Sequence, residues 1–160
     1  MTRYRQKDEQ GRVHFNMDFG TWFITAGTDD DFDKIDAYLT AKTDLNRTYG
    51  VEIKDYTNSG FDRPYSKYIW NGIDGGYQID YDKVDYLVMK CQEEGRIPIL
   101  YARFTDLTIV WDLRTIPYNA RKKQVWVNKD GQSYGKEKEL VIQTYLYKDE
   151  AKYIKKTITK

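Results

Sequence analysis

Residues 34–42 read KIDAYLTAK and residues 48–56 read TYGVEIKDY, and these two stretches decide the predicted fold. In each stretch apolar and polar residues alternate, which is the period of a β-strand with one buried face. Asp44, Leu45 and Asn46 between them suit a short hairpin loop, because Asn tolerates the left-handed conformation in which such loops end. We therefore predict an antiparallel hairpin with one apolar face and one polar face.

Three charged side chains fall on the polar face of this hairpin. Successive residues of a strand face opposite sides, so residues two apart share a face. If the apolar residues of both stretches cover the same core, Asp36 lies on the other face together with Glu52 and Lys54. A turn centred on Leu45 places Asp36 directly across from Lys54 and diagonal to Glu52. We therefore predict that two carboxylates and one ammonium group converge at one point.

Such a point suits a hard divalent cation. Two neighbouring carboxylates repel each other, and Mg²⁺ or Mn²⁺ between them relieves the repulsion because these ions prefer oxygen ligands. Asp36 and Glu52 are the candidate metal ligands, and the backbone carbonyl of Ile53 is a further one. A Glu-x-Lys tripeptide by itself is common and usually lies on a solvated face. The prediction therefore depends on Asp36 sharing that face.

A helix is predicted after the hairpin. Asp80 or Asp82 can cap its start, and Gly95 can close its end. Its apolar stripe runs from Val84 to Cys91 with helical spacing, so Cys91 is interpreted as a core residue rather than a nucleophile.

The rest of the chain predicts a mixed α/β domain. Strands are predicted at residues 97–104, 107–113, 124–127 and 140–146, and a closing helix at residues 149–158. Residues 11–25 fit either a strand or a short helix, and residues 55–78 form a long irregular loop. We predict one domain over residues 1–160, with a core at about 32–113 and a basic, β-rich extension at 114–160.

Composition bounds the class of protein. With 160 residues, 40% hydrophobic and 32% charged, the chain has the balance of a soluble globular domain. It contains no apolar stretch long enough to cross a bilayer, and residues 1–12 lack the apolar core of a signal peptide. The single cysteine, Cys91, excludes an internal disulfide and a cysteine-based zinc site. We therefore expect a cytoplasmic protein with no membrane partner.

The charges are unevenly distributed along the chain. Residues 1–113 contain 14 Lys and Arg against 20 Asp and Glu, a net of −6, whereas residues 114–160 contain 12 against 5, a net of +7. The acidic part could hold a cation and the basic part could contact a polyanion. The alternative is that the lysines of residues 114–160 form an ordinary solvated surface. The charge distribution by itself favours this alternative over a contact with a polyanion.

Residues 33–40 and 49–55 resemble the D…(D/E)-x-K core of the PD-(D/E)XK nuclease superfamily, especially small nuclease-like proteins of bacteria and their phages with a Holliday-junction-resolvase-like core. The resemblance covers about residues 32–113, because the family core continues with an amphipathic helix and a further strand pair. It implies a restriction-endonuclease-like mixed β-sheet flanked by helices, and a Mg²⁺- or Mn²⁺-dependent deoxyribonuclease. Asp36 and Glu52 would then bind the metal, and Lys54 would be the catalytic lysine.

The resemblance also singles out Lys83, because the helix of the family commonly offers a Gln or Lys near its start. Lys83 lies in the first predicted helical turn, where the positive end of the helix dipole favours a phosphate. The alternative is a lysine paired with Asp80 or its neighbours. Many members of the family also have an N-terminal helix with a further acidic residue. The sequence shows no clear counterpart, and Glu9 and Asp18 are the candidates.

The missing acid keeps two alternatives open. One is a catalytically weak or inactive nuclease fold that binds nucleic acid or serves assembly, and the other is a β-rich protein-interaction domain. His14 is the only histidine, and no serine lies in a nucleophile-elbow pattern, so His14 is interpreted as structural.

A nuclease also needs a surface for its substrate, which we expect to be DNA. The chain has 15 Tyr and 4 Trp, most of which we assign to packing, but several lie with cations in the long loop and could form a groove. The groove candidates are Tyr56, Arg63, Tyr65, Lys67, Tyr68 and Trp70, and a second set for backbone contacts is Arg121, Lys122 and Lys123. A homodimer is a further expectation, because many small nucleases pair to cut two strands.

Overall fold

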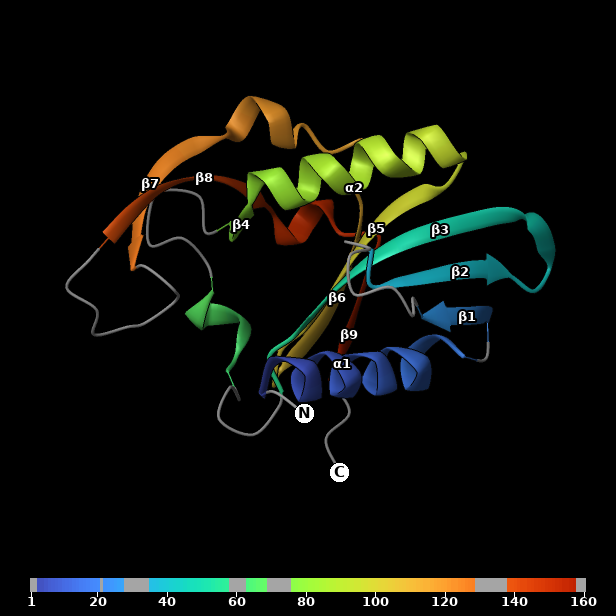
Figure 1. Ribbon diagram of the computed structural model, residues 1–160. Helices are drawn as coiled ribbons and strands as arrows, with labels where there is room; N and C mark the ends of the chain where they lie inside the picture. Colours follow the sequence, from blue (N-terminus) through green and yellow to red (C-terminus); the bar gives the residue numbers. More distant parts are fainter. Residues whose placement is uncertain are drawn as a thin grey trace.

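The computed structural model describes residues 3–20, 22–27, 35–57, 63–68, 76–128 and 138–157. These residues form two α-helices, α1 (Arg3–Phe19) and α2 (Tyr81–Glu94), and two β-sheets (Figure 1). Short 3-10 helices lie in the connections: η1 (Tyr65–Lys67), η2 (Tyr118–Arg121) and η4 (Lys148–Glu150). The mixed α/β class predicted from the sequence is confirmed.

The larger sheet has six strands in the order β1-β2-β3-β5-β6-β9. Strands β3 and β5 are parallel, and the other neighbouring pairs are antiparallel. The strands are β1 (Phe23–Gly27), β2 (Ala37–Ala41), β3 (Asp44–Asp55), β5 (Ile97–Arg103), β6 (Leu107–Asp112) and β9 (Tyr153–Lys156).

Helix α2 is the crossover that parallel pairing requires, because two parallel strands cannot be joined by a tight turn. Asp80 caps its start by accepting a hydrogen bond from the Asp82 N–H at 3.0 Å. Gly95 ends it in the left-handed conformation, with φ of 68°, which glycine adopts without steric cost. Val84, Leu87 and Cys91 form its buried stripe. The predicted helix and both of its caps are confirmed.

The large sheet has a hydrophobic core on each face. Helix α1 covers one face, where Phe15 packs with Val51 and Tyr101. Helix α2 covers the other, where Leu87 packs with residues such as Leu100. Figure 1 shows the six-stranded sheet between the two helices. The alternating residues of β3 and β5 therefore serve different cores.

The second sheet extends the α2 side of the molecule. Its strands, in the order β4-β8-β7, are antiparallel to their neighbours. Tyr77 of this sheet stacks on Trp111 of the large sheet, with ring centroids 5.6 Å apart. The bounds are β4 (Tyr77–Asp80), β7 (Lys123–Asn128) and β8 (Lys138–Leu146).

Most predicted strands are confirmed, including the hairpin, which turns at Lys42 and Thr43 rather than at Leu45. The predicted helix at residues 149–158 is wrong. Only η4 forms there, and β9 then adds to the edge of β6, with Ile154 opposite Ile109. An available sheet edge and the β-favouring residues of β9 outweigh the weak helical pattern.

Residues 11–25, left open between strand and helix, contain both. Residues 13, 15, 17 and 19 are all apolar, so their order along the chain mimics a strand. Of these four residues, Phe15 and Phe19 pack in the core, whereas Val13 and Met17 are exposed. Strand β1 follows from Phe23. Contact with the sheet, rather than the sequence period, therefore decides the helix.

Gly50 marks the closest approach of β3 to α2, and its substitution tests this packing. A Cβ atom at Gly50 would lie 2.5 Å from the buried Cys91 Sγ. Gly50→Ala should therefore lower the free energy of unfolding by about 1–3 kcal/mol. Urea unfolding of the double-mutant cycle checks the cause, because Cys91→Ala removes the obstructing sulfur and should reduce the cost. An equal cost in both backgrounds would show that the sulfur is not responsible.

Candidate functional site

The structure brings Asp36, Glu52 and Lys54 together on the α2 side of the large sheet. Val51 and Ile53 contact the core beneath α1, so Glu52 and Lys54 face the opposite way. The ammonium of Lys54 lies 3.3 Å from the Glu52 carboxylate. Asp36 lies just before β2, and its carboxyl group is within electrostatic reach of that of Glu52.

The register of the hairpin differs from the predicted one by two residues. Ala37 pairs with Val51, and the Asp36 N–H also donates to the Val51 carbonyl, so Asp36 lies beside Val51 and Glu52 rather than opposite Lys54. A shift of two residues keeps every side chain on its predicted face, because the period of a strand is two. Asp36, Glu52 and Lys54 therefore share one face even though the predicted turn was wrong.

Asp36 is held by the backbone of β3. Its N–H donates to the Val51 carbonyl at 3.0 Å, and its Oδ2 accepts from the Ile53 N–H at 2.8 Å. The side chain of Arg12 on α1 donates to the Asp36 carbonyl at 3.2 Å. These contacts fix the backbone of Asp36 and one oxygen of its carboxyl group.

The Ile53 carbonyl faces the same edge of β3 as Asp36. The N–H and C=O of one strand residue point to the same neighbour, and the N–H of Ile53 points to Asp36. The ladder of β2 with β3 begins only at the Ala37–Val51 pair. The carbonyl therefore points to the edge of β3 on which Asp36 lies, and its role as a metal ligand stays a prediction.

Crowding of the two carboxylates changes the titration of Asp36. Burial is the largest cause that raises its pKa, and the negative charge of Glu52 raises it further, to about 7 from an ordinary 3.8. For Lys54, burial alone would lower the pKa. The negative charge of Glu52 is the largest cause that outweighs burial, and the pKa is raised. Lys54 is therefore an ammonium ion at neutral pH.

Lys83 joins the cluster from the first turn of α2. A crossover helix runs back against the direction of its parallel strands, so its N-terminus lies near the end of β3 that carries Lys54. The positive charge of Lys54 is the largest cause that lowers the pKa of Lys83, and Glu52 and Asp80 oppose it. Four predicted residues therefore lie within electrostatic reach of one another.

The aromatic residues proposed for a groove pack mainly against one another. Tyr56 stacks on Phe104 with ring centroids 5.1 Å apart, and its hydroxyl lies 2.5 Å from that of Tyr77. Tyr65 and Tyr68 also contact Phe104. Their role in the described structure is therefore packing beside the charged cluster. Trp70 lies outside the described residues.

The candidate cations are placed differently. Arg63 is exposed, and its backbone N–H donates to the Tyr56 carbonyl at 2.9 Å. Lys67 ends η1, and its side chain lies outside the described part of the structure. Lys122 and Lys123 are exposed and lie over the rings of Tyr81 and Tyr145, 5.0 and 5.8 Å from the centroids.

Arg121 is committed to a structural ion pair. Its guanidinium donates to both Glu150 oxygens at 2.6 Å and to the Tyr145 carbonyl at 3.2 Å, and it covers the ring of Tyr147. Because these bonds use most of the N–H donors of the guanidinium group, few donors remain for a phosphate. Of the three predicted contacts in this segment, Arg121 therefore fits worst.

Helix α1 carries both candidate acids, Glu9 and Asp18. Asp18 accepts a hydrogen bond from the Tyr101 hydroxyl at 2.5 Å and pairs with Lys155. Tyr101 belongs to the core beneath α1, so Asp18 lies on the face away from Glu52. The side chain of Glu9 lies outside the described residues.

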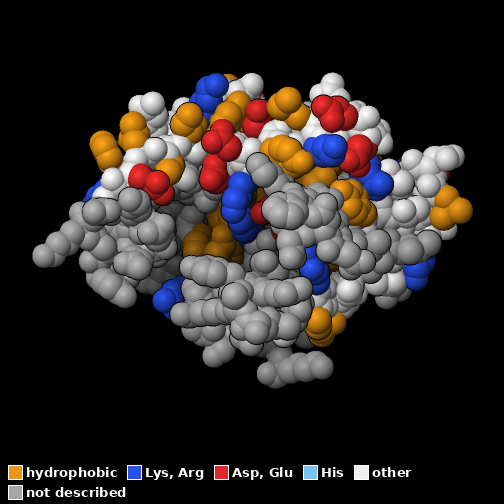
Figure 2. All heavy atoms as spheres, in the orientation of Figure 1, with side chains coloured by type: hydrophobic (Ala, Val, Ile, Leu, Met, Phe, Trp, Pro, Cys, Tyr) orange, Lys and Arg blue, Asp and Glu red, His pale blue; other side chains and the backbone are white. Residues whose placement is uncertain are grey.

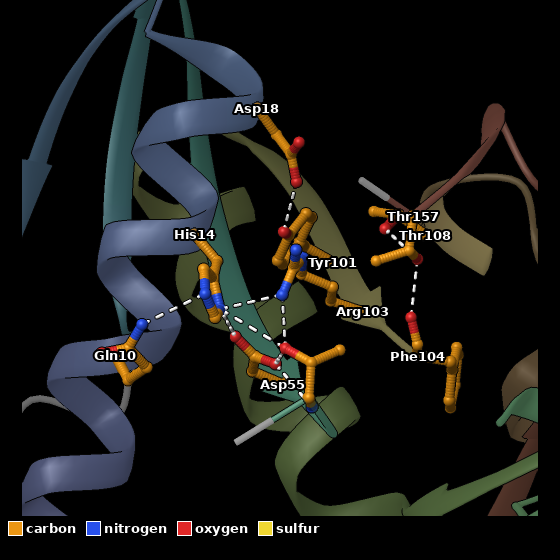
Figure 3. Close-up of polar contacts among 10 residues, drawn as sticks. Gln10, His14, Asp18, Asp55, Tyr101, Arg103, Phe104, Thr108 and Thr157 are labelled. Atoms are coloured by element: carbon orange, nitrogen blue, oxygen red, sulfur yellow. Dashed lines mark hydrogen bonds and ion pairs between the residues drawn. The ribbon is translucent and has the colours of Figure 1, made fainter. Parts of the chain in front are cut away.

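A second polar cluster ties α1 to the end of β3, and the sequence did not reveal it (Figure 3). The His14 Nδ1 contacts the Asp55 carboxylate and lies 3.1 Å from Arg103 Nη1. Arg103 is only 7% exposed and donates to Thr57, which donates to Asp55 at 2.6 Å. The structural role predicted for His14 agrees with these contacts. Arg103, which ends the apolar strand β5, was the one sign in the sequence that a buried polar cluster lies here.

Figure 2 shows acidic and basic side chains interspersed over the α2 side of the molecule, rather than a field of one sign. Among the described residues, no group of three or more His, Cys, Asp or Glu side chains is arranged to hold a metal ion. The cluster at Asp36 contributes two carboxylates and a backbone carbonyl, so a cation there would complete its shell with water.

Comparisons with protein-family models, with curated proteins and with solved structures find no match to this chain. Neither described helix is long and apolar enough to span a membrane.

The Arg121–Glu150 pair predicts a pH-dependent stability. The hydrogen bond from Arg121 is the main cause that lowers the pKa of Glu150 below 4.5. A lowered carboxylate pKa stabilises the fold above the unfolded value, and the gain is lost as the pH falls through the folded value. Glu150→Gln should therefore cost about 1 kcal/mol near pH 7. In thermal unfolding, the difference from the wild type should disappear as the pH falls below 4.5; a difference independent of pH would contradict this account.

Proposed function

We propose that this chain is a metal-dependent nuclease of the PD-(D/E)XK type, which hydrolyses phosphodiester bonds of DNA. The observation that carries the proposal is the convergence of Asp36, Glu52, Lys54 and Lys83 at one end of β3. Two carboxylates beside two ammonium groups offer ligands for a cation and contacts for a phosphate at the same place.

The donor set fits Mg²⁺ or Mn²⁺. Asp36 and Glu52 supply carboxylate oxygens, and the Ile53 carbonyl faces the same edge. Burial, and after it the negative charge of Glu52, raises the pKa of Asp36, so the site disfavours two ionised carboxylates side by side. A divalent cation bound there would compensate their charge, polarise a phosphoryl oxygen and lower the pKa of a bound water.

The two lysines have separate roles in this proposal. Lys54 is held against Glu52 as an ammonium ion, so it positions the attacking water and the phosphate rather than accepting a proton. Lys83 is exposed at the positive end of the α2 dipole, where it contacts a phosphate oxygen. Lys122 and Lys123, both exposed, extend contact to the DNA backbone without reading its sequence.

The order of elements supports the restriction-endonuclease-like interpretation. Helix α1 precedes the antiparallel strands β1, β2 and β3, α2 crosses over, and the strand pair β5–β6 follows. These are the parts that the resemblance implies, in the same order, with the acidic and basic residues on the second and third strands and the helix.

A second candidate is a nuclease fold that binds nucleic acid with little or no catalysis. The observation that favours it is the position of Asp18, which is paired with Tyr101 and Lys155 on the far face of the sheet. Within the described side chains, the cluster has no third carboxylate. The two candidates differ in cleavage and agree in binding.

The test combines cleavage with thermal stability. The protein is incubated with single-stranded, duplex and branched DNA in Mg²⁺, Mn²⁺ or EDTA, alongside Asp36→Asn, Lys54→Ala and Lys83→Ala. Cleavage should require the metal and should fall by at least about 100-fold in Asp36→Asn and Lys54→Ala. Lys83→Ala should weaken binding of DNA more than it slows the bound enzyme.

Matched controls are Asp44→Asn on the exposed turn of the same hairpin and Lys138→Ala on β8. Asparagine at position 36 can still accept the Ile53 N–H, so the variant should fold, and without metal it should melt no lower than the wild type. It should lose the rise in melting temperature that metal gives the wild type. Binding without cleavage supports the second candidate, and cleavage that persists in EDTA or in Asp36→Asn contradicts the proposed site.

A further inference from the structure

A cavity of about 510 Å³ opens on the α1 side of the large sheet, on the opposite face from the charged cluster. Tyr49 of β3 lines it, and Lys54 lies five residues further along the same strand. At about 3.3 Å per residue, the two positions are roughly 16 Å apart along the strand. The cavity is therefore separate from the proposed nuclease site, and its volume is within the usual range for small-molecule pockets.

The interior of the cavity is hydrocarbon. Its floor is formed by side chains of four neighbouring strands, β2, β3, β5 and β6. These side chains are Leu39, Tyr49, Ile99 and Val110. Phe15, Phe19 and Phe23 line it from α1 and the start of β1. The three Phe side chains therefore lie on one side of the cavity, and the strand residues of the floor lie on the other. Burying a further apolar group here would remove more hydrocarbon surface from water.

The mouth of the cavity is positively charged. Arg47, Arg114 and Lys152 line it, and all three are exposed. The one carboxylate of the lining, Asp112, is paired with Arg114 at 2.7 Å. Three cations against one carboxylate leave an excess of positive charge next to the apolar interior.

We propose that this cavity binds a small amphipathic anion, with a hydrocarbon body inside and a carboxylate at the mouth. The class is that of medium-chain fatty acids. A nucleotide fits less well, because the polar edges of its base would lose hydrogen bonds against a floor of Leu, Ile and Val side chains. A neutral hydrocarbon would gain nothing from the excess positive charge at the mouth.

The experiment titrates the full-length protein with dodecanoate below its micelle concentration, by calorimetry and by displacement of the anionic dye anilinonaphthalene sulfonate. Octanoate and the uncharged 1-octanol are compared in the same displacement assay. Dodecanoate should bind one site per chain, and octanol should displace the dye at least about tenfold less effectively than octanoate.

Variants distinguish binding that depends on the cations of the cavity mouth from non-specific binding to the protein surface. The triple variant Arg47→Gln/Arg114→Gln/Lys152→Gln should weaken dodecanoate binding by about tenfold or more. The control Lys90→Gln/Lys138→Gln/Lys148→Gln removes the same charge from α2, β8 and η4, outside the cavity, and should bind as the wild type does. Ile97→Trp, at a partly exposed position of the lining, should block the cavity.

Three results of the binding experiments would overturn the proposal, and a fourth would come from sedimentation. The first three are no binding of dodecanoate up to about 1 mM, equal binding by the two triple variants, or equal displacement by octanol and octanoate. If sedimentation shows a dimer that the triple variant or Ile97→Trp disrupts, a second copy of the chain is the occupant and the proposal fails. None of these outcomes depends on cleavage of DNA, so this proposal and the nuclease proposal stand or fall separately.

Discussion

The parallel pairing of β3 with β5 is the constraint on which the rest of the structure depends. Because parallel neighbours cannot be joined by a tight turn, the chain must cross one face of the sheet, and α2 makes that crossing. The crossover buries one side of β3 under α2 while α1 buries the other. It also returns the start of α2 to the end of β3, which is why Lys83 meets Lys54 although 29 positions of sequence separate them.

The candidate cluster shows how local charge and global topology cooperate. Each carboxylate is supplied by one strand of a hairpin, yet burial by distant parts of the chain gives the pair its unusual titration. Lys54 remains charged because Glu52 and Asp36 compensate for its burial. The same side chains on an isolated hairpin would be solvated and unremarkable in their chemistry, since water would screen them.

Prediction from sequence succeeded where a period of two or a helix cap left a local signature. The shared face of Asp36, Glu52 and Lys54 was predicted because strand alternation fixes faces even when the register is wrong by two residues. It failed where contacts distant in sequence decide the outcome. Helix α1 forms because Phe15 and Phe19 find the sheet, and β9 forms because β6 offers an edge. The pair of Arg121 with Glu150 was equally hidden, because nothing local links residues 29 positions apart.

Strand β9 also has a consequence for the order of assembly. It completes the edge of the sheet with residues 153–156, and Lys155 closes on Asp18, 137 positions earlier. Helix α1 therefore cannot complete its polar contacts while the chain is still short. During synthesis, Thr157 can form its hydrogen bonds with the Thr108 hydroxyl and the Phe104 carbonyl only after the ribosome has passed residue 157. Until then β6 presents an open edge, the kind of surface at which nascent chains associate wrongly.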